Sequence, residues 1–597
     1  MKKTVSEITS DFIASKGIDK VFLLTGGGIM YLTDAFAKNE KIDYICNFHE
    51  QACAIAAEGY ARVTGKPGVC LVTTGPGASN AISGALSAWH DSIPLIIICG
   101  QVRTNIIADN YDKIRQIGPQ EANIIELAKS MTKYAISLRN KEDIYQILDE
   151  AYEKATSGRP GPVIIEIPLD IQSAFVENDR TEYKTHHKST QIEVSDDQIE
   201  FFFNEIKKSK YPILFPGNGI RIGNSYDLWM KFLKMINIPV VLPYCAKDLI
   251  PFENLLNLGV VGTNGQRPAN FAVQNCDLFI SLASGLSISK IGFNAAGFAP
   301  LAKKIAIDID KSQLTSHPIN IDIRIQSDIK IFLEKAIYWL SKNEIEINYK
   351  WIEACKFWKN KYPMRNDSWE KDTSHVNMYN FIEKLSIKAD SKSIILTGNG
   401  YECPGVYQSF QVKDGQRVLI SGNWGAMGWD LPAAVGAAVA EKNKQVFLLT
   451  GDGSVMLNIQ ELSTIKANKL PIKIFIFNNK GYAAIRFTQN NLLNGYLVGA
   501  DFTTGLTNPS FELLANAFDL KYYQINDNLE IEDTILKVLK EEGPVLCELN
   551  ISEDVRIEPK AQAIKNLDGT ITSKPLNDMY PYLPQEEINY NNNFFRD

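Results

Sequence analysis

Two apolar runs in the last third of the chain each end in an oxygen-bearing side chain. The first run, residues 446–449, is followed by Gly-Asp-Gly-Ser, which places Asp452 just beyond it. The second run, residues 474–477, is followed by Asn478 and Asn479. A stretch with helical character separates them, so the pattern predicts two parallel buried strands joined by a helix. Because parallel strands end at the same edge of a sheet, we expect Asp452 and Asn479 to lie close together.

These oxygens suit a hard divalent cation. Mg²⁺ prefers carboxylate, amide and carbonyl oxygens, and it commonly completes its coordination with phosphate oxygens of a substrate or cofactor. Glycines on both sides of Asp452 would let the backbone approach a diphosphate closely. The sequence has neither the spaced acids of an EF-hand loop nor a phosphate loop ending in Lys-Ser or Lys-Thr. The remaining alternative is a pair of unrelated surface turns.

The Gly-Asp-Gly run, the 24 residues after it and the Asn-Asn pair together resemble the metal–diphosphate motif of thiamine-diphosphate (ThDP) enzymes. The resemblance implies that Mg²⁺ is bound by Asp452, Asn479 and the backbone carbonyl of Gly481. It also implies contacts to the ThDP diphosphate from Gly451, Gly453 and Ser454.

The order of apolar runs along the chain predicts an α/β protein. With 597 residues the chain is expected to form about two to four domains. Apolar runs alternate with helical patterns, which is typical of parallel sheets. We expect strands at residues 20–25, 44–49, 68–74, 94–100, 162–168, 211–219, 238–244, 277–284, 303–310, 393–400, 417–423, 445–453, 472–479 and 544–550.

These runs fall into three regions. We expect three doubly wound parallel-sheet domains at residues 1–175, 190–345 and 370–555, and a tail at 556–597 that lies over the surface or frays. The polar stretch 177–198 is expected to be a linker. Three such regions in this order resemble the acetolactate synthase (acetohydroxyacid synthase) and pyruvate oxidase branch of the ThDP enzymes. The resemblance implies a pyrimidine-binding first domain, a central domain like an FAD domain, and a diphosphate-binding third domain.

Composition excludes several classes of protein. The chain is 45% apolar and 22% charged, as in globular proteins, and its net charge of −7 without a long basic run argues against nucleic acid as a partner. The nine cysteines are scattered without a Cys-x-x-Cys pair, which favours reduced thiols in the cytoplasm. We find no apolar signal sequence and no run long enough to cross a membrane, so we expect no membrane association.

Glu50 is the first candidate catalytic residue. It follows a strand-like run and opens the helical run QACAIAAEGYARVTG. The resembled family has a Glu in a similar setting, which implies that Glu50 binds the ThDP aminopyrimidine and exchanges a proton with its ring nitrogen. The alternative is a helix N-terminal Glu that is stabilised only by the helix dipole.

Three further candidates come from loops of the first region. The Gly75-Pro76-Gly77 turn resembles a family segment that implies Asn80 as a cofactor contact. The glycine run ending at Gly28 matches a dinucleotide fingerprint only in part. It better resembles a family loop in which a backbone amide stabilises developing oxyanion charge. Gln120 fits the active-site glutamine of acetolactate synthases, but Pro119 stands where that family has Phe.

Two loops of the third region complete the candidate site. Met427 fits the large apolar side chain that the family places beneath the cofactor to hold its bent shape; a core methionine is the alternative. Gly400 and Tyr401 align with a loop on the diphosphate side. The neighbouring Glu402 is an unfavourable neighbour for a phosphate.

The central region leaves FAD binding open. Relatives tend to have Gly-Ser-Arg after one of its strands, and that arginine can bind an FAD phosphate with two hydrogen bonds. Here the strand ends Ala283-Ser284-Gly285, so the arginine is missing. The sequence is compatible both with FAD and with its absence.

The resemblance implies a ThDP- and Mg²⁺-dependent carboligase. We expect it to decarboxylate pyruvate and to transfer the two-carbon acyl unit to a carbonyl acceptor, either a 2-oxo acid or a ketosugar nucleotide. The run after the metal motif resembles ThDP proteins of nucleotide-sugar pathways, and we expect Arg486 and Gln489 to meet a sugar or phosphate. Alternatives are a 2-oxo acid decarboxylase or oxidase without carboligation, and a non-catalytic regulator. The family implies a homodimer or homotetramer whose sites lie across subunits.

Overall fold

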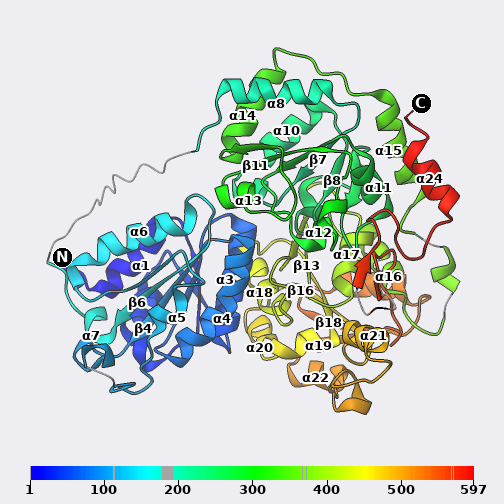
Figure 1. Ribbon diagram of the computed structural model, residues 1–597. Coiled ribbons are helices and arrows are strands. Elements are labelled where there is room, and N and C mark those ends of the chain that lie inside the picture. Colours follow the sequence, from blue (N-terminus) through cyan, green and yellow to red (C-terminus); the bar gives the residue numbers. More distant parts are fainter. Residues whose placement is uncertain are drawn as a thin grey trace.

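The computed structural model describes residues 2–111, 114–177, 192–365, 367–371, 373–565, 568 and 571–596. Eighteen of its strands form three six-stranded parallel sheets with helices on both faces, as the sequence predicts. The strands β19 (Ala563–Lys565) and β20 (Ile571–Ser573) form a separate antiparallel pair. Figure 1 shows the first sheet in blue, the central sheet in green, and the third in yellow and orange. Residues 178–191 of the predicted linker lie outside the described residues.

The first sheet has the order β2-β1-β3-β4-β6-β5. Successive residues of a strand face opposite sides, so Ile96 and Ile98 belong to one core and Ile97 to another. Helices α1 (Val5–Ser15), α2 (Met30–Lys38) and α6 (Ile144–Thr156) cover the first face, and α3 (Glu50–Thr64) and α4 (Pro76–Asp91) cover the second. The strands are β1 (Lys20–Leu23), β2 (Asp43–Cys46), β3 (Gly68–Val72), β4 (Leu95–Gln101), β5 (Tyr134–Ser137) and β6 (Pro162–Pro168).

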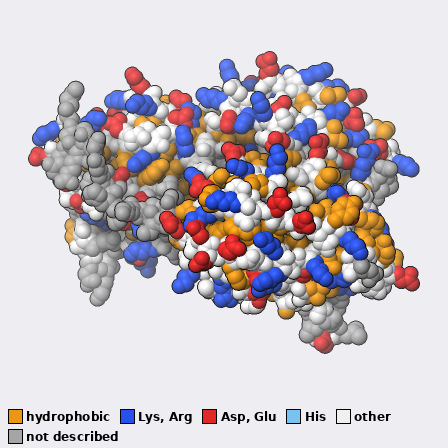
Figure 2. Space-filling model, turned by 90° about the horizontal axis from the view of Figure 1, so that it is seen from above, with side chains coloured by type: hydrophobic (Ala, Val, Ile, Leu, Met, Phe, Trp, Pro, Cys, Tyr) orange, Lys and Arg blue, Asp and Glu red, His pale blue; other side chains and the backbone are white. Residues whose placement is uncertain are grey.

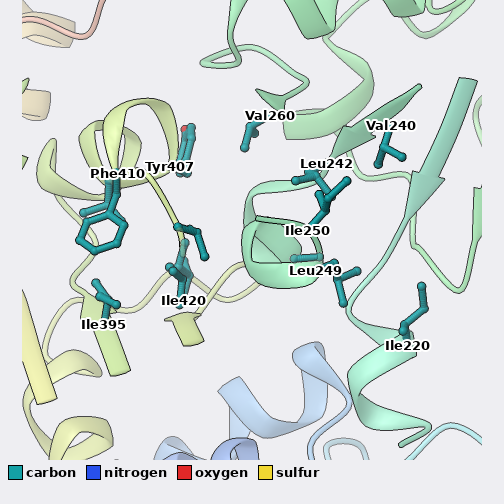
Figure 3. Packing of buried hydrophobic residues seen from close by; sticks show 14 of the residues in the cluster. Ile220, Val240, Leu242, Leu249, Ile250, Val260, Ile395, Tyr407, Phe410 and Ile420 are labelled. Atoms are coloured by element: carbon teal, nitrogen blue, oxygen red, sulfur yellow. The ribbon is translucent and has the colours of Figure 1, made fainter. Parts of the chain in front are cut away.

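The central sheet has the order β12-β11-β10-β7-β8-β9. A single apolar cluster runs from this sheet into the third one; Figure 3 shows Leu249 and Ile250 on the central side, and Ile395, Tyr407 and Phe410 on the other. The two regions therefore share a core. The strands are β7 (Pro212–Pro216), β8 (Val240–Leu242), β9 (Asn257–Val260), β10 (Leu278–Leu282), β11 (Lys303–Asp308) and β12 (Ile323–Gln326).

The third sheet has the order β14-β13-β15-β16-β18-β17. Helices α18 (Asp430–Ala440) and α20 (Glu461–Ala467) pack on one face, and α16 (Met378–Lys388), α17 (Glu402–Ser409) and α23 (Ile531–Lys540) pack on the other. The strands are β13 (Ile394–Thr397), β14 (Arg417–Ile420), β15 (Val446–Gly451), β16 (Ile472–Asn478), β17 (Lys521–Ile525) and β18 (Val545–Asn550).

Helices α3 and α18 join the first and third regions and lie side by side (Figure 1). Their backbones approach so closely that a Cβ atom on Gly59 would lie 2.9 Å from Ala433 Cα, and one on Gly436 would overlap the Ala56 carbonyl oxygen. Only glycine permits this approach, because any larger residue would push the helices apart. The pair fixes the start of α3, which carries Glu50, against the third region.

The C-terminal tail packs on the central region and does not fray where it is described. Helix α24 (Gln585–Asn593) lies beside α15 (Tyr349–Lys361), as Figure 1 shows. After it, Phe595 is only 4% exposed and its ring lies 5.2 Å from that of Trp351. Aromatic burial therefore anchors the tail.

The face of the molecule that is seen from above is mixed in charge. Figure 2 shows Lys and Arg interspersed with Asp and Glu on the face seen from above. Among the described residues, no helix combines the length and the apolar character needed to cross a membrane.

Candidate active site

The predicted metal site consists of Asp452 and residues 479–481, and we call it the metal loop. It lies at the edge where β15 and β16 end. The two strands are parallel neighbours, with Gly451 opposite Phe477. Asp452 and Asn479 follow them and are 1% and 6% exposed. The Asp452 carboxylate accepts a hydrogen bond from Gly453 N at Oδ1, 3.0 Å, and from Gly481 N at Oδ2, 2.8 Å. The structure therefore brings the predicted metal residues together.

The electrostatics of this loop suit a cation. Burial raises the pKa of Asp452 to about 7, although the N–H groups of Gly481 and Gly453 and the charge of Arg486 act against the rise. A bound cation would stabilise the ionised form of this buried carboxylate. No group of three or more His, Cys, Asp or Glu side chains that could hold a metal ion occurs in the described part of the chain. One carboxylate with an amide and a carbonyl oxygen is the incomplete donor set that Mg²⁺ completes with phosphate oxygens, so the residues fit the ion.

Met427 and Ser454, two predicted cofactor contacts, lie beside Gly453 and Gly428. A Cβ atom on Gly453 would overlap the Tyr482 ring and lie 3.4 Å from Met427 Cε, so this glycine sits between two large side chains. Ser454 Oγ accepts a hydrogen bond from Gly428 N at 2.9 Å and donates one to Asp430 Oδ1 at 3.0 Å.

The loop of Gly400 and Tyr401 lies beside the same edge. It follows β13 and leads into α17, whose first residue, Glu402, is 2% exposed. Burial raises the pKa of Glu402 to about 8, and the nearby Asp430 and Asp452 add to the rise. Neither Glu402 Oε1 nor Asp430 Oδ2 has a hydrogen-bond partner within the described ranges. Glu402 is therefore a neutral acid at pH 7, which removes the repulsion that an ionised carboxylate would have for a phosphate.

A second cluster forms around Glu50 at the start of α3. Asn80 Nδ2 donates to Glu50 Oε2 at 3.0 Å, and a Cβ on Gly77 would lie 3.3 Å from Glu50 Oε1. Gly75 has φ 52°, and a Cβ there would overlap the carbonyl oxygen of Gln120, which itself has φ 63°. The structure thus brings together Glu50, Asn80 and Gln120, which are up to 70 residues apart in sequence.

Gly28 departs from its predicted role. Its N–H, which we expected to face a reacting carbonyl, donates to Thr73 Oγ1 at 3.2 Å. Its carbonyl accepts from Gln172 Nε2 at 2.7 Å. Thr73 ends the strand run that leads to the Gly75 turn, so Gly28 braces that turn and its amide is not free for a substrate oxygen in this structure.

Side chains that the sequence analysis missed connect the two clusters. Glu461 is fully buried, and its carboxylate accepts from Asn47 Nδ2 at 2.8 Å and from Phe48 N at 3.0 Å. Asn458 Nδ2 donates to Gly428 O at 2.7 Å and lies 3.4 Å from Gln51 Oε1. These contacts hold the residues on either side of Glu50 against the third region. No local motif marks them, since the partners are about 400 residues apart.

Arg486 and Gln489 do not have the role that we expected. Arg486 is buried, and its guanidinium donates to backbone oxygens that include those of Asn479 at 2.8 Å and Glu553 at 3.0 Å. Gln489 bonds both the N–H and the carbonyl of Val498. Both side chains are committed to the protein's own backbone, so the expectation that they meet a sugar is wrong for this conformation.

The central region contains a cavity of about 690 Å³ at the carboxyl ends of β7, β10 and β11. Ligands of α/β proteins bind at such strand ends, and the volume is within the usual range for small-molecule sites. Ser284 Oγ and His317 Nδ1 on its wall are buried without a hydrogen-bond partner in the described part of the chain. The cavity is therefore large enough for a nucleotide-sized group such as FAD, even though the expected arginine is missing.

Comparisons with known proteins match all three regions. Residues 3–126 match the thiamine pyrophosphate enzyme N-terminal TPP-binding domain, 199–336 the central domain, and 402–549 the C-terminal TPP-binding domain; thiamine pyrophosphate is another name for ThDP. The acetolactate synthase large subunit of Lactococcus lactis is 31% identical over 95% of this chain and 96% of its own length. Chloroplastic acetolactate synthase of Arabidopsis thaliana is 30% identical over 95% of this chain and 84% of its own. The isozyme 2 large subunit of Escherichia coli is 30% identical over 92% and 95%.

Proposed function

Because the chain belongs to the thiamine pyrophosphate enzymes, with acetolactate synthase large subunits among its relatives, we propose that it decarboxylates pyruvate and transfers the two-carbon unit to a carbonyl acceptor. The family matches support a ThDP-dependent carboligase. The parts of the function that we propose beyond this are pyruvate as the donor substrate, Mg²⁺ as the metal ion and the carbonyl acceptor. The observation that carries them is the pairing of a Glu50–Asn80 cluster with a buried Asp452–Gly481 loop in one chain.

Each residue has a distinct task in this proposal. When bound, ThDP supplies the carbanion chemistry at its thiazolium ring. Glu50 holds and exchanges a proton at Oε1, the oxygen left free when Asn80 occupies Oε2. Asp452 and Asn479, with the carbonyl of Gly481, would hold Mg²⁺. Met427, which lies beside Gly453, would contact the cofactor.

The acceptor can be a 2-oxo acid or a ketosugar nucleotide. The larger acceptor is supported by Pro119, which is exposed beside the exposed Gln120 and lacks the bulk of the Phe found in acetolactate synthases. Loss of an aromatic side chain leaves room for a larger molecule. Selection would then depend on polar groups left unpaired by a small acceptor, which can discriminate by roughly 10⁴-fold.

The test is a mass-spectrometric assay of the full-length protein with ThDP, Mg²⁺ and pyruvate, with and without a 4-ketosugar nucleotide. A sugar adduct two carbons larger supports the large acceptor. Acetolactate at an ordinary enzymatic rate without a sugar adduct assigns the 2-oxo acid acceptor. Consumption of pyruvate without any coupled product would show a decarboxylase or oxidase, and the carboligase proposal would then be wrong.

We also propose that the working form is a dimer or a dimer of dimers. Exposed apolar side chains follow the ends of the neighbouring strands β1 and β2, the sheet edge at which α3 begins: Met30, Tyr31 and Phe48 are 51%, 43% and 58% exposed. A second subunit would cover them and complete the site, as the resemblance implies. Mixing a Glu50 variant with an Asp452 variant should restore activity in heterodimers. Full activity in a monomer isolated by sedimentation would contradict the proposal.

We propose that FAD occupies the central cavity, in contact with Ser284 and His317. Both residues line the cavity, and each has a buried polar atom without a hydrogen-bond partner among the described residues. The absorbance and fluorescence of flavin released from the purified protein by heat test this directly. If the protein binds ThDP but neither contains nor takes up FAD, the FAD proposal is wrong. The carboligase proposal would be unaffected.

A further inference from the structure

The segment after the metal loop, residues 482–508, folds back onto it; we call this segment the strap. It contains α21 (Ala483–Leu492) and the short helix η9 (Phe502–Thr504). Gly481 and Asp501 form an antiparallel bridge, and Tyr482 N donates to Ala500 O at 2.9 Å. The strap therefore leaves the metal loop, turns at its exposed end and returns to the same place.

The C-terminal end of the strap contacts the carboxylate of Asp452. Asn508 Nδ2 donates to Asp452 Oδ2 at 2.9 Å, and Gly481 N donates to the same oxygen at 2.8 Å. A carboxylate oxygen has about two lone-pair sites, so these two donors occupy Oδ2. Within the described part of the chain, Oδ1 accepts a hydrogen bond from the adjacent Gly453 N at 3.0 Å. The arrangement fixes the carboxylate plane and leaves Oδ1 the less occupied of the two oxygens.

The N-terminal half of the strap contacts Asn479, the other side chain of the proposed metal site. Arg486, 7% exposed, donates through one nitrogen to the Asn479 carbonyl at 2.8 Å and to Asn479 Oδ1 at 3.3 Å. Its second nitrogen donates to Ala500 O at 3.3 Å, on the returning part of the strap. One guanidinium therefore ties the metal loop to both halves of the strap, which a planar fork does better than the point charge of a lysine.

From these contacts we propose that Asn508 and Arg486 are positioning residues of the Mg²⁺–diphosphate site. Asn508 sets the orientation of Asp452, and Arg486 sets that of Asn479. The strap is thus part of the cofactor site, and its order and the affinity for Mg²⁺ depend on each other. This inference rests on the proposed Mg²⁺–ThDP function of the loop.

Gln489 provides the matched control. Its side chain bonds the N–H of Val498 at 2.9 Å and the carbonyl of Val498 at 3.1 Å, so it stabilises the exposed end of the strap. It touches neither metal residue. Gln489→Ala loosens the strap far from the metal loop, whereas Asn508→Ala and Arg486→Lys remove contacts at the loop itself.

Calorimetry measures the affinity of the full-length protein for ThDP at a series of Mg²⁺ concentrations. No substrate is added, so no turnover occurs. Hydrogen bonds to charged groups are strong enough that Asn508→Ala and Arg486→Lys should each weaken Mg²⁺-dependent binding by about tenfold or more. Gln489→Ala should stay within about twofold of wild type. Hydrogen exchange in residues 482–508 should slow when Mg²⁺ and ThDP bind to wild type, and less so in Asn508→Ala.

The outcomes separate the two proposals. If the wild-type protein shows no Mg²⁺-dependent binding of ThDP, the proposed function is contradicted. Wild type that binds, with Asn508→Ala and Arg486→Lys binding equally well, overturns the inference. Equal losses in all three variants would also overturn it, because a general effect of strap folding would then explain them. Thermal unfolding without ligand identifies a misfolded variant, and Asn508→Ala, at a half-buried side chain, keeps the test decisive if Arg486→Lys fails to fold.

Discussion

Glu402→Gln tests whether a neutral carboxylic acid lies beside Gly451, next to Asp452. Burial raises the pKa of Glu402 from 4.5 to about 8. A Cβ on Gly398 would lie 2.8 Å from Glu402 Oε1 and 2.7 Å from Asp430 Oδ2, so these two unpaired oxygens face the same small space. A protonated Glu402, or the amide that replaces it, can donate into this space toward Asp430.

The sign of the pH effect follows from proton binding. The folded protein keeps the Glu402 proton up to about pH 8, whereas the unfolded chain releases it near 4.5. Between these values the folded state binds more protons, so its stability falls as pH rises. At 1.36 kcal/mol per pH unit, the loss approaches about 5 kcal/mol above pH 8. Glu402→Gln cannot ionise, so it should escape this loss and be more stable than wild type at high pH.

The assay is the thermal midpoint of ligand-free wild type and variant from pH 5 to pH 9. The difference should be small at pH 5 and grow to on the order of 10 °C in favour of the variant at high pH. Glu542→Gln, at an exposed position of the same region, should show no growing difference. A constant difference across this pH range for Glu402→Gln would refute the neutral-acid assignment.

Four further predictions concern the site and its frame. Glu50→Gln should fold and bind ThDP but slow hydrogen–deuterium exchange at the thiazolium C2 by about 10²-fold or more, and a wild-type exchange rate would refute its role. Asp452→Ala should abolish Mg²⁺-dependent ThDP binding in calorimetry, because the metal loses its only carboxylate ligand from the loop. Gly75→Ala should disturb the Gln120 turn and weaken cofactor binding, since the new Cβ would overlap the Gln120 carbonyl. Gly59→Ala should lower stability by about 1–3 kcal/mol through overlap with α18, whereas Gly543→Ala, with open space around it, should not; equal midpoints would contradict the close helix contact.

The sequence predicted the interior strands better than the sheet edges. The structure has a strand at each predicted position. Besides β19 and β20, which pair only with each other, four strands were not predicted: β5, β9, β12 and β17. All four lie at the edge of their sheet. An edge strand is covered less completely; β5 is half-buried throughout, and β17 has only one fully buried residue. Such strands lack the continuous apolar run that marks a strand buried on both faces.

Local sequence by itself determined the three-region α/β plan and the two strand ends that carry Asp452 and Asn479. Both depend on apolar runs and on glycines beside polar residues, which are visible within a few dozen residues. The tertiary structure decided the rest. It showed that Gly28 braces a turn, that Arg486 holds the metal loop, and that Asn508 reaches Asp452 from 56 residues away. Periodicity records which face of an element is buried, but not which distant side chain meets it there, because that meeting depends on how separate elements pack.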